Sequence, residues 1–317
     1  MTTSASPASP APVRGRNGAL FDRDAVSFGI TPTCWTNDDF PTVGDDIPFE
    51  QCVSEMALAG FEGCSVGHKY PTDPRTLRQA LELRGLRVSE PWSSTYFTAE
   101  GMWDRTVAAF RRQLDFIKAA GGDRVVVAEL AGAVHQQQVA LVANKPVFDD
   151  NAWHRLLTGL DTLGRMAAGQ DMLLCYHHHM GTGVQTRAEV DRLLAGTDPE
   201  LVHLLLDTGH LAWSGDDPLE LVRDHADRIR HVHLKDLRHD VLEDCRRLDP
   251  SFRDAVLAGI FTVPGDGMLD FGPVLRTLAD AGYRGWLVVE AEQDPAKAHP
   301  LTYAKKAREY LHTLTGL

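Results

Sequence analysis

The chain has 317 residues, 43% of them hydrophobic and 24% charged, which is enough to bury the core of one large α/β domain. Its formal net charge of −12 argues against nucleic acid as a partner, because proteins that bind phosphates normally present clustered Lys and Arg. The five cysteines form no CxxC pair, so neither a zinc knuckle nor a disulfide framework is indicated, and we expect a cytoplasmic protein.

We expect a disordered tail over residues 1–24, followed by one folded domain over 25–317. The first twenty residues, MTTSASPASPAPVRGRNGAL, are rich in Ser, Ala and Pro and contain no apolar run that could form a signal-peptide core. No stretch of the chain offers the roughly 18 uninterrupted apolar residues that a membrane helix needs, so we expect no membrane association.

From about residue 25, short apolar runs typical of buried strands alternate with longer amphipathic segments. The predicted strands cover residues 28–33, 63–66, 87–91, 124–128, 172–176, 202–206, 229–234 and 286–289. The segment after Asp236 is longer than a usual βα loop, which predicts extra helices over the mouth of the sheet.

These eight strands, alternating with helices, favour a closed barrel over an open doubly wound sheet. No GxGxxG follows the first predicted strand, so the usual signature of a dinucleotide fold is missing. The predicted fold class is α/β, as a single (β/α)8 barrel of the TIM type. In such barrels the reactive groups project from the carboxyl ends of the strands.

Imidazole and carboxylate side chains follow four of the predicted strands. The expected metal ligands are His177, Asp207, His233 and Glu290. This donor set suits a divalent ion, with Mn²⁺ or Co²⁺ preferred and Zn²⁺, Fe²⁺ or Mg²⁺ as alternatives. A single residue of this kind is more often a capping group, but four strand ends seldom combine so by chance. Alternate strand residues share a face, so His179 and His231 stay open as alternatives to His177 and His233.

Other polar and aromatic residues near the strand ends are candidates for substrate contacts. They are Trp35, Asn37, Asp38, His68, Trp92 and His210. The tryptophans could pack on the carbon face of a ring, although core packing is the commoner use of Trp. Glu129 ends an apolar run and is expected to face the cavity as a carboxylate base, with a structural ion pair as the alternative. Lys69 is a candidate acid or base if it is desolvated, and an ordinary solvated lysine otherwise.

A family resemblance covers roughly residues 29–311. It is carried by stretches such as VGHKYPTDP, YHHHMGTGVQT, LLLDTGHLAW, DRIRHVHLKDLR, FTVPGDGMLDF and GWLVVEAEQDP. These stretches resemble inosose (2-keto-myo-inositol) dehydratases, of the xylose isomerase-like barrel superfamily. The resemblance implies the same barrel, a divalent metal and a cyclitol or keto-sugar substrate. The superfamily's metal pattern falls on Asp207, His233 and Glu290, whereas His177 stands where many relatives carry Glu.

The chain departs from this family pattern after the second strand. It reads GCSVGHKYP where inosose dehydratases usually read something like GTEVGNKYP, so Ser65 replaces Glu and His68 replaces Asn. A carboxylate lost from the pocket floor would alter the substrate or remove an acid or base. The ending EPWSSTYF of the third strand also differs from the pattern.

The reaction implied by the resemblance removes water from a polyhydroxy ketone through an enediolate. Glu290 or Glu129 is expected to take the proton next to the ketone, and Lys69, His179 or Lys235 to protonate the departing hydroxyl. A metal-dependent ketose or cyclitol epimerase is the runner-up, because it shares the first half of this reaction. An endonuclease at abasic DNA and a non-catalytic sugar-binding protein are the alternatives from other classes, and a homo-oligomer is left open.

Overall fold

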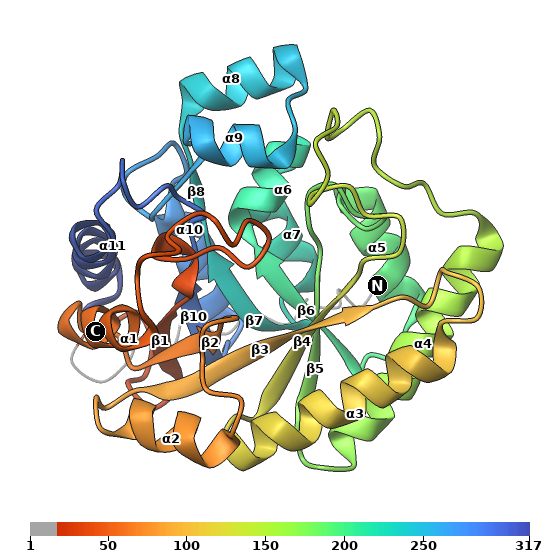
Figure 1. Cartoon of the computed structure of the whole chain (residues 1–317), viewed down its shortest axis with the longest axis horizontal. Helices are drawn as coiled ribbons and strands as arrows, with labels where there is room; N and C mark the ends of the chain where they lie inside the picture. Colours follow the sequence, from red (N-terminus) through yellow and green to blue (C-terminus); the bar gives the residue numbers. More distant parts are fainter. Residues whose placement is uncertain (1–17) are drawn as a thin grey trace, which may run out of the picture.

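Eight parallel strands close into a barrel in a computed structural model that describes residues 18–317. The strands pair in the order β1-β10-β7-β6-β5-β4-β3-β2 and surround the centre of Figure 1. Their bounds are β1 (Val26–Ile30), β2 (Gly63–Val66), β3 (Arg87–Thr95), β4 (Arg124–Glu129), β5 (Leu173–His177), β6 (Val202–Asp207), β7 (Ile229–Leu234) and β10 (Gly285–Val289). The predicted (β/α)8 barrel and all eight predicted strands are therefore confirmed.

Helices follow the strands and form the outer layer. They are η1 (Pro32–Cys34), α1 (Phe49–Leu58), α2 (Pro74–Glu82), α3 (Trp103–Ala120), α4 (Asp150–Ala168), α5 (Arg187–Gly196), α6 (Thr208–Ser214), α7 (Pro218–His225), α10 (Phe271–Asp280) and α11 (Pro300–Thr315). Local signals start several of them: Asp73 caps α2, and Thr186 forms a capping box with Glu189 at the start of α5.

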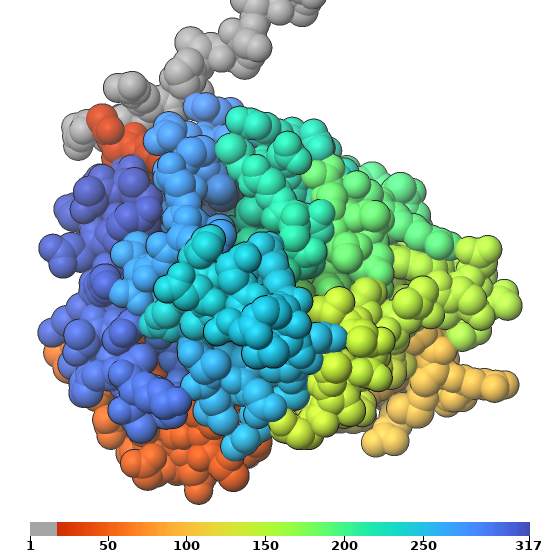
Figure 2. All heavy atoms as spheres, turned by 90° about the horizontal axis from the view of Figure 1, so that it is seen from above, coloured from red at the N-terminus to blue at the C-terminus, as the bar shows by residue number. Residues whose placement is uncertain are grey.

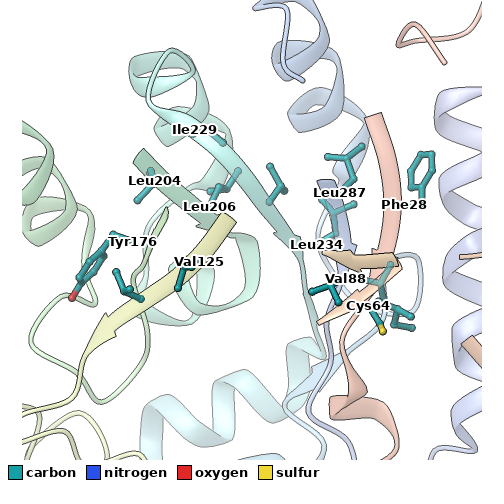
Figure 3. Close-up of a cluster of buried hydrophobic side chains, with 14 of the residues drawn as sticks. Phe28, Cys64, Val88, Val125, Tyr176, Leu204, Leu206, Ile229, Leu234 and Leu287 are labelled. Carbon is teal, nitrogen blue, oxygen red and sulfur yellow. The ribbon is translucent and has the colours of Figure 1, made fainter. Parts of the chain in front are cut away.

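Strand residues alternate between the helical layer and the barrel interior. In β6, Leu204 and Leu206 join the large core cluster that also contains helix residues, and Figure 3 shows both beside Ile229 of β7. Leu205, between them, instead packs with Val126 and Cys175 inside the barrel. This period of two decides which polar residues at the strand ends reach the interior.

Extra helices cover one end of the barrel, as the long segment after Asp236 predicted. They are α8 (His239–Leu248) and α9 (Phe252–Ala258), which lie between the short paired strands β8 (Asp236–Leu237) and β9 (Phe261–Thr262). Both helices lie at the top of Figure 1, and Figure 2 shows the same region from above, where its cyan and blue atoms cover the middle of the face. Phe252 and Phe261 belong to a separate apolar cluster that packs this cover on the barrel.

Of the predicted tail over residues 1–24, residues 1–17 lie outside the described part of the chain. Residues 18–24 belong to the folded domain instead, because Phe21 is buried in the core and the Leu20 backbone N–H donates to the carbonyl of Thr315 at 2.8 Å. Within residues 18–317, no helix is long and apolar enough to cross a membrane.

Candidate metal centre and substrate cavity

Four ligand-type side chains converge inside one end of the barrel. His177 ends β5, Asp207 ends β6, His233 lies near the end of β7 and Glu290 follows β10. One side-chain nitrogen or oxygen from each lies within 4.8 Å of the others, and all four residues are buried. Strand alternation explains the convergence. Tyr176 and Leu206 face the helices, so the residues after them, His177 and Asp207, face the barrel interior.

The distances in this cluster match the ligand spacing of a divalent ion. Asp207 Oδ2 lies 3.3 Å from His177 Nε2 and 3.7 Å from His233 Nδ1, and Glu290 Oε2 lies 2.6 Å from His233 Nδ1. Metal–ligand bonds of about 2.0–2.2 Å place neighbouring ligand atoms roughly 3 Å apart. Two imidazoles and two carboxylates also form a donor set that suits a borderline divalent metal, so the residues fit the expected ion.

The electrostatics of the cluster favour positive charge at this place. Burial alone would lower the pKa of His233, but Glu290 and Asp207 beside it raise that pKa well above its ordinary value. Burial would likewise raise the pKa of Asp207, yet the Lys235 ammonium and the neighbouring imidazoles hold it well below the usual range. A carboxylate pair that stabilises protonated neighbours in this way would also stabilise a metal ion.

A cavity opens beside the cluster and exposes three of the predicted substrate-contact residues. Its lining includes Asn37, Asp38 and Trp92, together with His177, His179, His233 and Glu290. The Trp92 ring is roughly perpendicular to the rings of His177 and His179, with centroids 5.5 and 6.2 Å away. Asn37 Oδ1 accepts hydrogen bonds from the backbone N–H groups of Asp39 and Phe40, while its buried amide Nδ2 has no partner within the described chain. This amide is free to donate to a ligand.

His179 presents a lone pair to the cavity. Its Nδ1 lies 2.8 Å from the carbonyl oxygen of Met180, which can only accept, so Nδ1 carries the proton. In the neutral ring the lone pair is then on Nε2. Burial, with His135 and His177 nearby, lowers the pKa of His179 well below its ordinary value, which favours this neutral form.

Lys235 and His210 lie behind the cavity lining and are fully buried. The Lys235 ammonium lies 2.8 Å from Glu292 Oε2, 3.2 Å from Glu290 Oε2 and 3.4 Å from Asp207 Oδ2. It also donates to His210 Nε2 at 2.9 Å. Lys235 therefore offsets the charge of the carboxylates and orients His210, and it is not placed to donate a proton to a molecule in the cavity.

Glu129 is not a cavity residue, contrary to the sequence-based expectation. Val125 and Val127 of β4 face the helices. Because alternate residues of a strand face the same side, Glu129 faces the helices too. Its carboxylate accepts from the backbone N–H groups of Phe97 and Thr98 and from the hydroxyls of Thr95 and Thr98, at 2.8–3.0 Å. Glu129 thus holds the loop after β3 against β4, a structural role.

Three further predicted site residues lie outside the cavity lining. The Lys69 ammonium donates to the backbone carbonyls of Gly44, Asp45 and Ile47, so it holds the loop before α1. The Trp35 indole N–H donates to Glu55 of α1 at 2.7 Å, within the core. His68 Nδ1 lies 2.7 Å from Asp38 Oδ1, which links the loops after β1 and β2 at the rim. Each of these residues shapes the loops around the site.

Glu90 of β3 lines the cavity, although it was not among the residues expected there from the sequence. Its Oε1 lies 3.3 Å from His233 Nε2, and its Oε2 lies 3.2 Å from His231 Nε2. Glu90 of β3 pairs with Ser65 of β2, the position at which the family pattern has Glu. A carboxylate is therefore present on the neighbouring strand. A charged residue within the run VSEPW was the available signal, because an unpaired Glu is rarely buried.

Glu292, Asp39 and Gln136 also line the cavity, although none was assigned to the site. Burial and the neighbouring Glu290 raise the pKa of Glu292 to about 7. The Gln136 amide donates to Asp39 Oδ1 at 2.8 Å and so joins the loops that follow β1 and β4 across the mouth. These loop residues carry no strand periodicity, which is why the sequence does not reveal that they face inward.

Known proteins share the architecture of this chain. The family model described as "Xylose isomerase-like TIM barrel" matches residues 53–314. An inosose dehydratase of Geobacillus thermodenitrificans is 50% identical over 299 residues, which cover 94% of this chain and 100% of the relative. The probable 3-DHS dehydratase AsbF of Bacillus anthracis shares the fold, with a TM-score of 0.68, 15% identity and coverage of 90% and 98% of the two chains.

A second solved structure, the IOLI protein with a binding zinc atom, also has a TM-score of 0.68, with 14% identity and coverage of 92% and 98%. At these identities the solved structures show the fold alone, while the inosose dehydratase matches at its full length. The chain thus belongs to the xylose isomerase-like TIM barrel family and, within it, to the inosose dehydratases.

Proposed function

We propose that this chain is a metal-dependent carbon–oxygen lyase that removes water from 2-keto-myo-inositol or a closely related cyclic polyhydroxy ketone. The observation that carries the proposal is the convergence of His177, Asp207, His233 and Glu290 beside the cavity. The full-length match to a protein named inosose dehydratase supports the substrate class. A homo-oligomeric assembly and a cytoplasmic location stay predictions.

The four converging residues would hold one divalent ion. Mn²⁺ or Co²⁺ is our first choice, because two carboxylates accompany the two imidazoles, and Zn²⁺ is the ion named for the IOLI structure. When bound, such an ion supplies Lewis-acid chemistry that makes the C–H bond next to a ketone more acidic.

The lining residues of the cavity would orient the ring of the substrate. The free amide of Asn37 would donate to a ring hydroxyl or carbonyl oxygen, since it has no other partner among the described residues. Trp92 would cover the carbon-bound hydrogens of one ring face. Together they would present the reacting carbon to His179.

His179 would move the proton in this reaction. Its Nε2 lone pair would take the hydrogen next to the ketone as a proton, and the C–H electron pair would form the enolate. The hydroxyl on the next carbon would then leave with the proton carried by Nε2, so one water is lost and the ring becomes an enol that tautomerises to a diketone. Glu290, the base suggested by the sequence, lies 2.6 Å from His233 Nδ1 and is needed as a ligand.

Mass spectrometry of the product provides the direct test. Purified enzyme loaded with Mn²⁺ or Co²⁺ and given 2-keto-myo-inositol should yield a product that is lighter by one water and absorbs in the ultraviolet. A product of unchanged mass with altered configuration would instead identify an epimerase. No product with a metal-loaded protein would contradict the dehydratase proposal.

A further inference from the structure

We propose that Glu90 is a positioning residue that fixes the proton of His233 on Nε2 and so leaves Nδ1 as the metal-binding atom. The inference rests on the metal site of the proposed function and adds a fifth side chain to it. Glu90 comes from β3, on the opposite side of the barrel interior from His233, and is 2% exposed. A buried carboxylate in an otherwise apolar strand requires partners, and the two imidazoles of β7 are those partners.

The two nitrogens of His233 face different carboxylates. Nδ1 points to Glu290 Oε2 at 2.6 Å and to Asp207 Oδ2 at 3.7 Å, whereas Nε2 points to Glu90 Oε1 at 3.3 Å. A neutral imidazole carries one proton, and a metal ion needs the lone pair of the other nitrogen. With Asp207 and Glu290 bound to the ion, Glu90 is the carboxylate left to accept a hydrogen bond from His233, so the proton belongs on Nε2 and Nδ1 is free to bind the ion between Asp207 and Glu290.

Glu90 also lies beside a second histidine. Its Oε2 lies 3.2 Å from Nε2 of His231, which is fully buried and shares the inward face of β7 with His233. The pair is close but lacks hydrogen-bond geometry, so within the described residues the hydrogen bond of Glu90 to a β7 imidazole is the one between Oε1 and His233 Nε2. A carboxylate behind a ligating histidine both orients the ring and makes it a stronger ligand.

The same three residues raise a competing arrangement. One atom each of Glu90, His231 and His233 lies within 4.8 Å of the others, which is the spacing of a second ion site. His233 would then have to give lone pairs from both nitrogens and keep no proton. With a single ion on Nδ1, Glu90 accepts a hydrogen bond from the Nε2–H group and both nitrogens of His233 have a partner. We therefore assign Glu90 as a hydrogen-bond partner of His233 and not as a ligand of a second ion.

The test uses the full chain, loaded with Zn²⁺ and labelled with ¹⁵N in histidine, without substrate. NMR should place the His233 proton on Nε2, and equilibrium dialysis should give one ion per chain. E90L removes the acceptor and should weaken Zn²⁺ binding by about 10–100-fold. E90Q retains an amide oxygen that can accept and should lose less affinity. E129Q, which alters a buried glutamate remote from the cluster, is the matched control and should bind Zn²⁺ like the wild type.

Three results would overturn the assignment. They are a His233 proton on Nδ1, two ions per wild-type chain that fall to one in E90L, and an E90L affinity equal to that of the wild type. Circular dichroism of E90L and E90Q checks that both variants fold, and the NMR measurement is made on the wild-type chain and so does not depend on either variant. Because substrate is absent, a protein that passes this test but does not dehydrate 2-keto-myo-inositol would count against the proposed function only.

Discussion

His177 Nε2 lies 3.3 Å from Asp207 Oδ2, although the two residues are 30 positions apart in the sequence; they end neighbouring strands of the barrel. Replacing Asp207 by Asn keeps the shape but removes one negative charge and a strong ligand. We expect the affinity for Mn²⁺ or Co²⁺ to fall by more than about 100-fold, since changes behind the ligands already cost 10–100-fold. Isothermal titration calorimetry measures this, with D216N as a control outside the cluster. Equal affinities in both variants would contradict the assigned ligand set.

Metal removal should lower the stability of the folded chain. Binding to the native state alone adds RT ln(1 + [L]/Kd), which is about 2.7 kcal/mol at an ion concentration of 100 times Kd. We therefore expect thermal unfolding at a lower temperature after chelation and recovery when the ion is restored. If the melting temperature depends on ion concentration as strongly in D207N as in the wild type, the cluster is not the binding site.

His179→Gln tests the proposed proton transfer. The variant loses the Nε2 base but none of the four expected metal ligands, so kcat should fall by about 10²–10⁴-fold while the metal affinity stays the same. Steady-state kinetics and metal titration on the same preparation separate the two effects. A parallel loss of bound metal would identify His179 as a ligand, which the sequence had left open.

Glu129→Gln tests the structural role of a residue that the sequence assigned to catalysis. The carboxylate accepts four hydrogen bonds, two of them from backbone N–H groups, and the amide of Gln cannot accept all four. We expect a loss of about 2 kcal/mol or more in the free energy of unfolding, measured by urea titration, with kcat changed by less than about threefold. A large fall in kcat at unchanged stability would restore Glu129 as a base.

His203 gives the chain an acid-sensitive component of stability that is independent of the metal. Burial and the nearby guanidinium groups of Arg230, Arg228 and Arg124 lower its pKa to about 4. Between that pKa and the unfolded value of about 6.5, the unfolded chain binds more protons, so stability falls as the pH falls. Water that still reaches the side chain screens part of the effect, which leaves about 1–2 kcal/mol.

H203Q should remove this part of the pH dependence. The measurement is urea unfolding of both proteins at pH 7 and pH 4.5, in the presence of chelator. Between pH 7 and pH 4.5, the free energy of unfolding should fall more in the wild type than in H203Q. Parallel pH profiles would show that His203 is not the responsible group.

The barrel could be predicted because its signals are local. Eight apolar runs and the amphipathic segments between them reflect periods of two and about 3.6, which depend on the chain alone. The same periodicity identified His177, Asp207, His233 and Glu290, since each follows or lies within an apolar strand and the barrel brings all strand ends together. The family resemblance added the reaction class.

The direction in which each side chain points and the groups that it contacts, by contrast, were decided by the tertiary structure. Glu129 follows an apolar run, as the four converging residues do, but the register of β4 turns it towards the helices. Lys69 donates to three backbone carbonyls. Glu90 contacts His233, which is 143 positions away in the sequence. The physical reason is that a strand's pattern fixes which residues alternate, whereas the closure of the barrel alone fixes which face turns inward and what each side chain meets there.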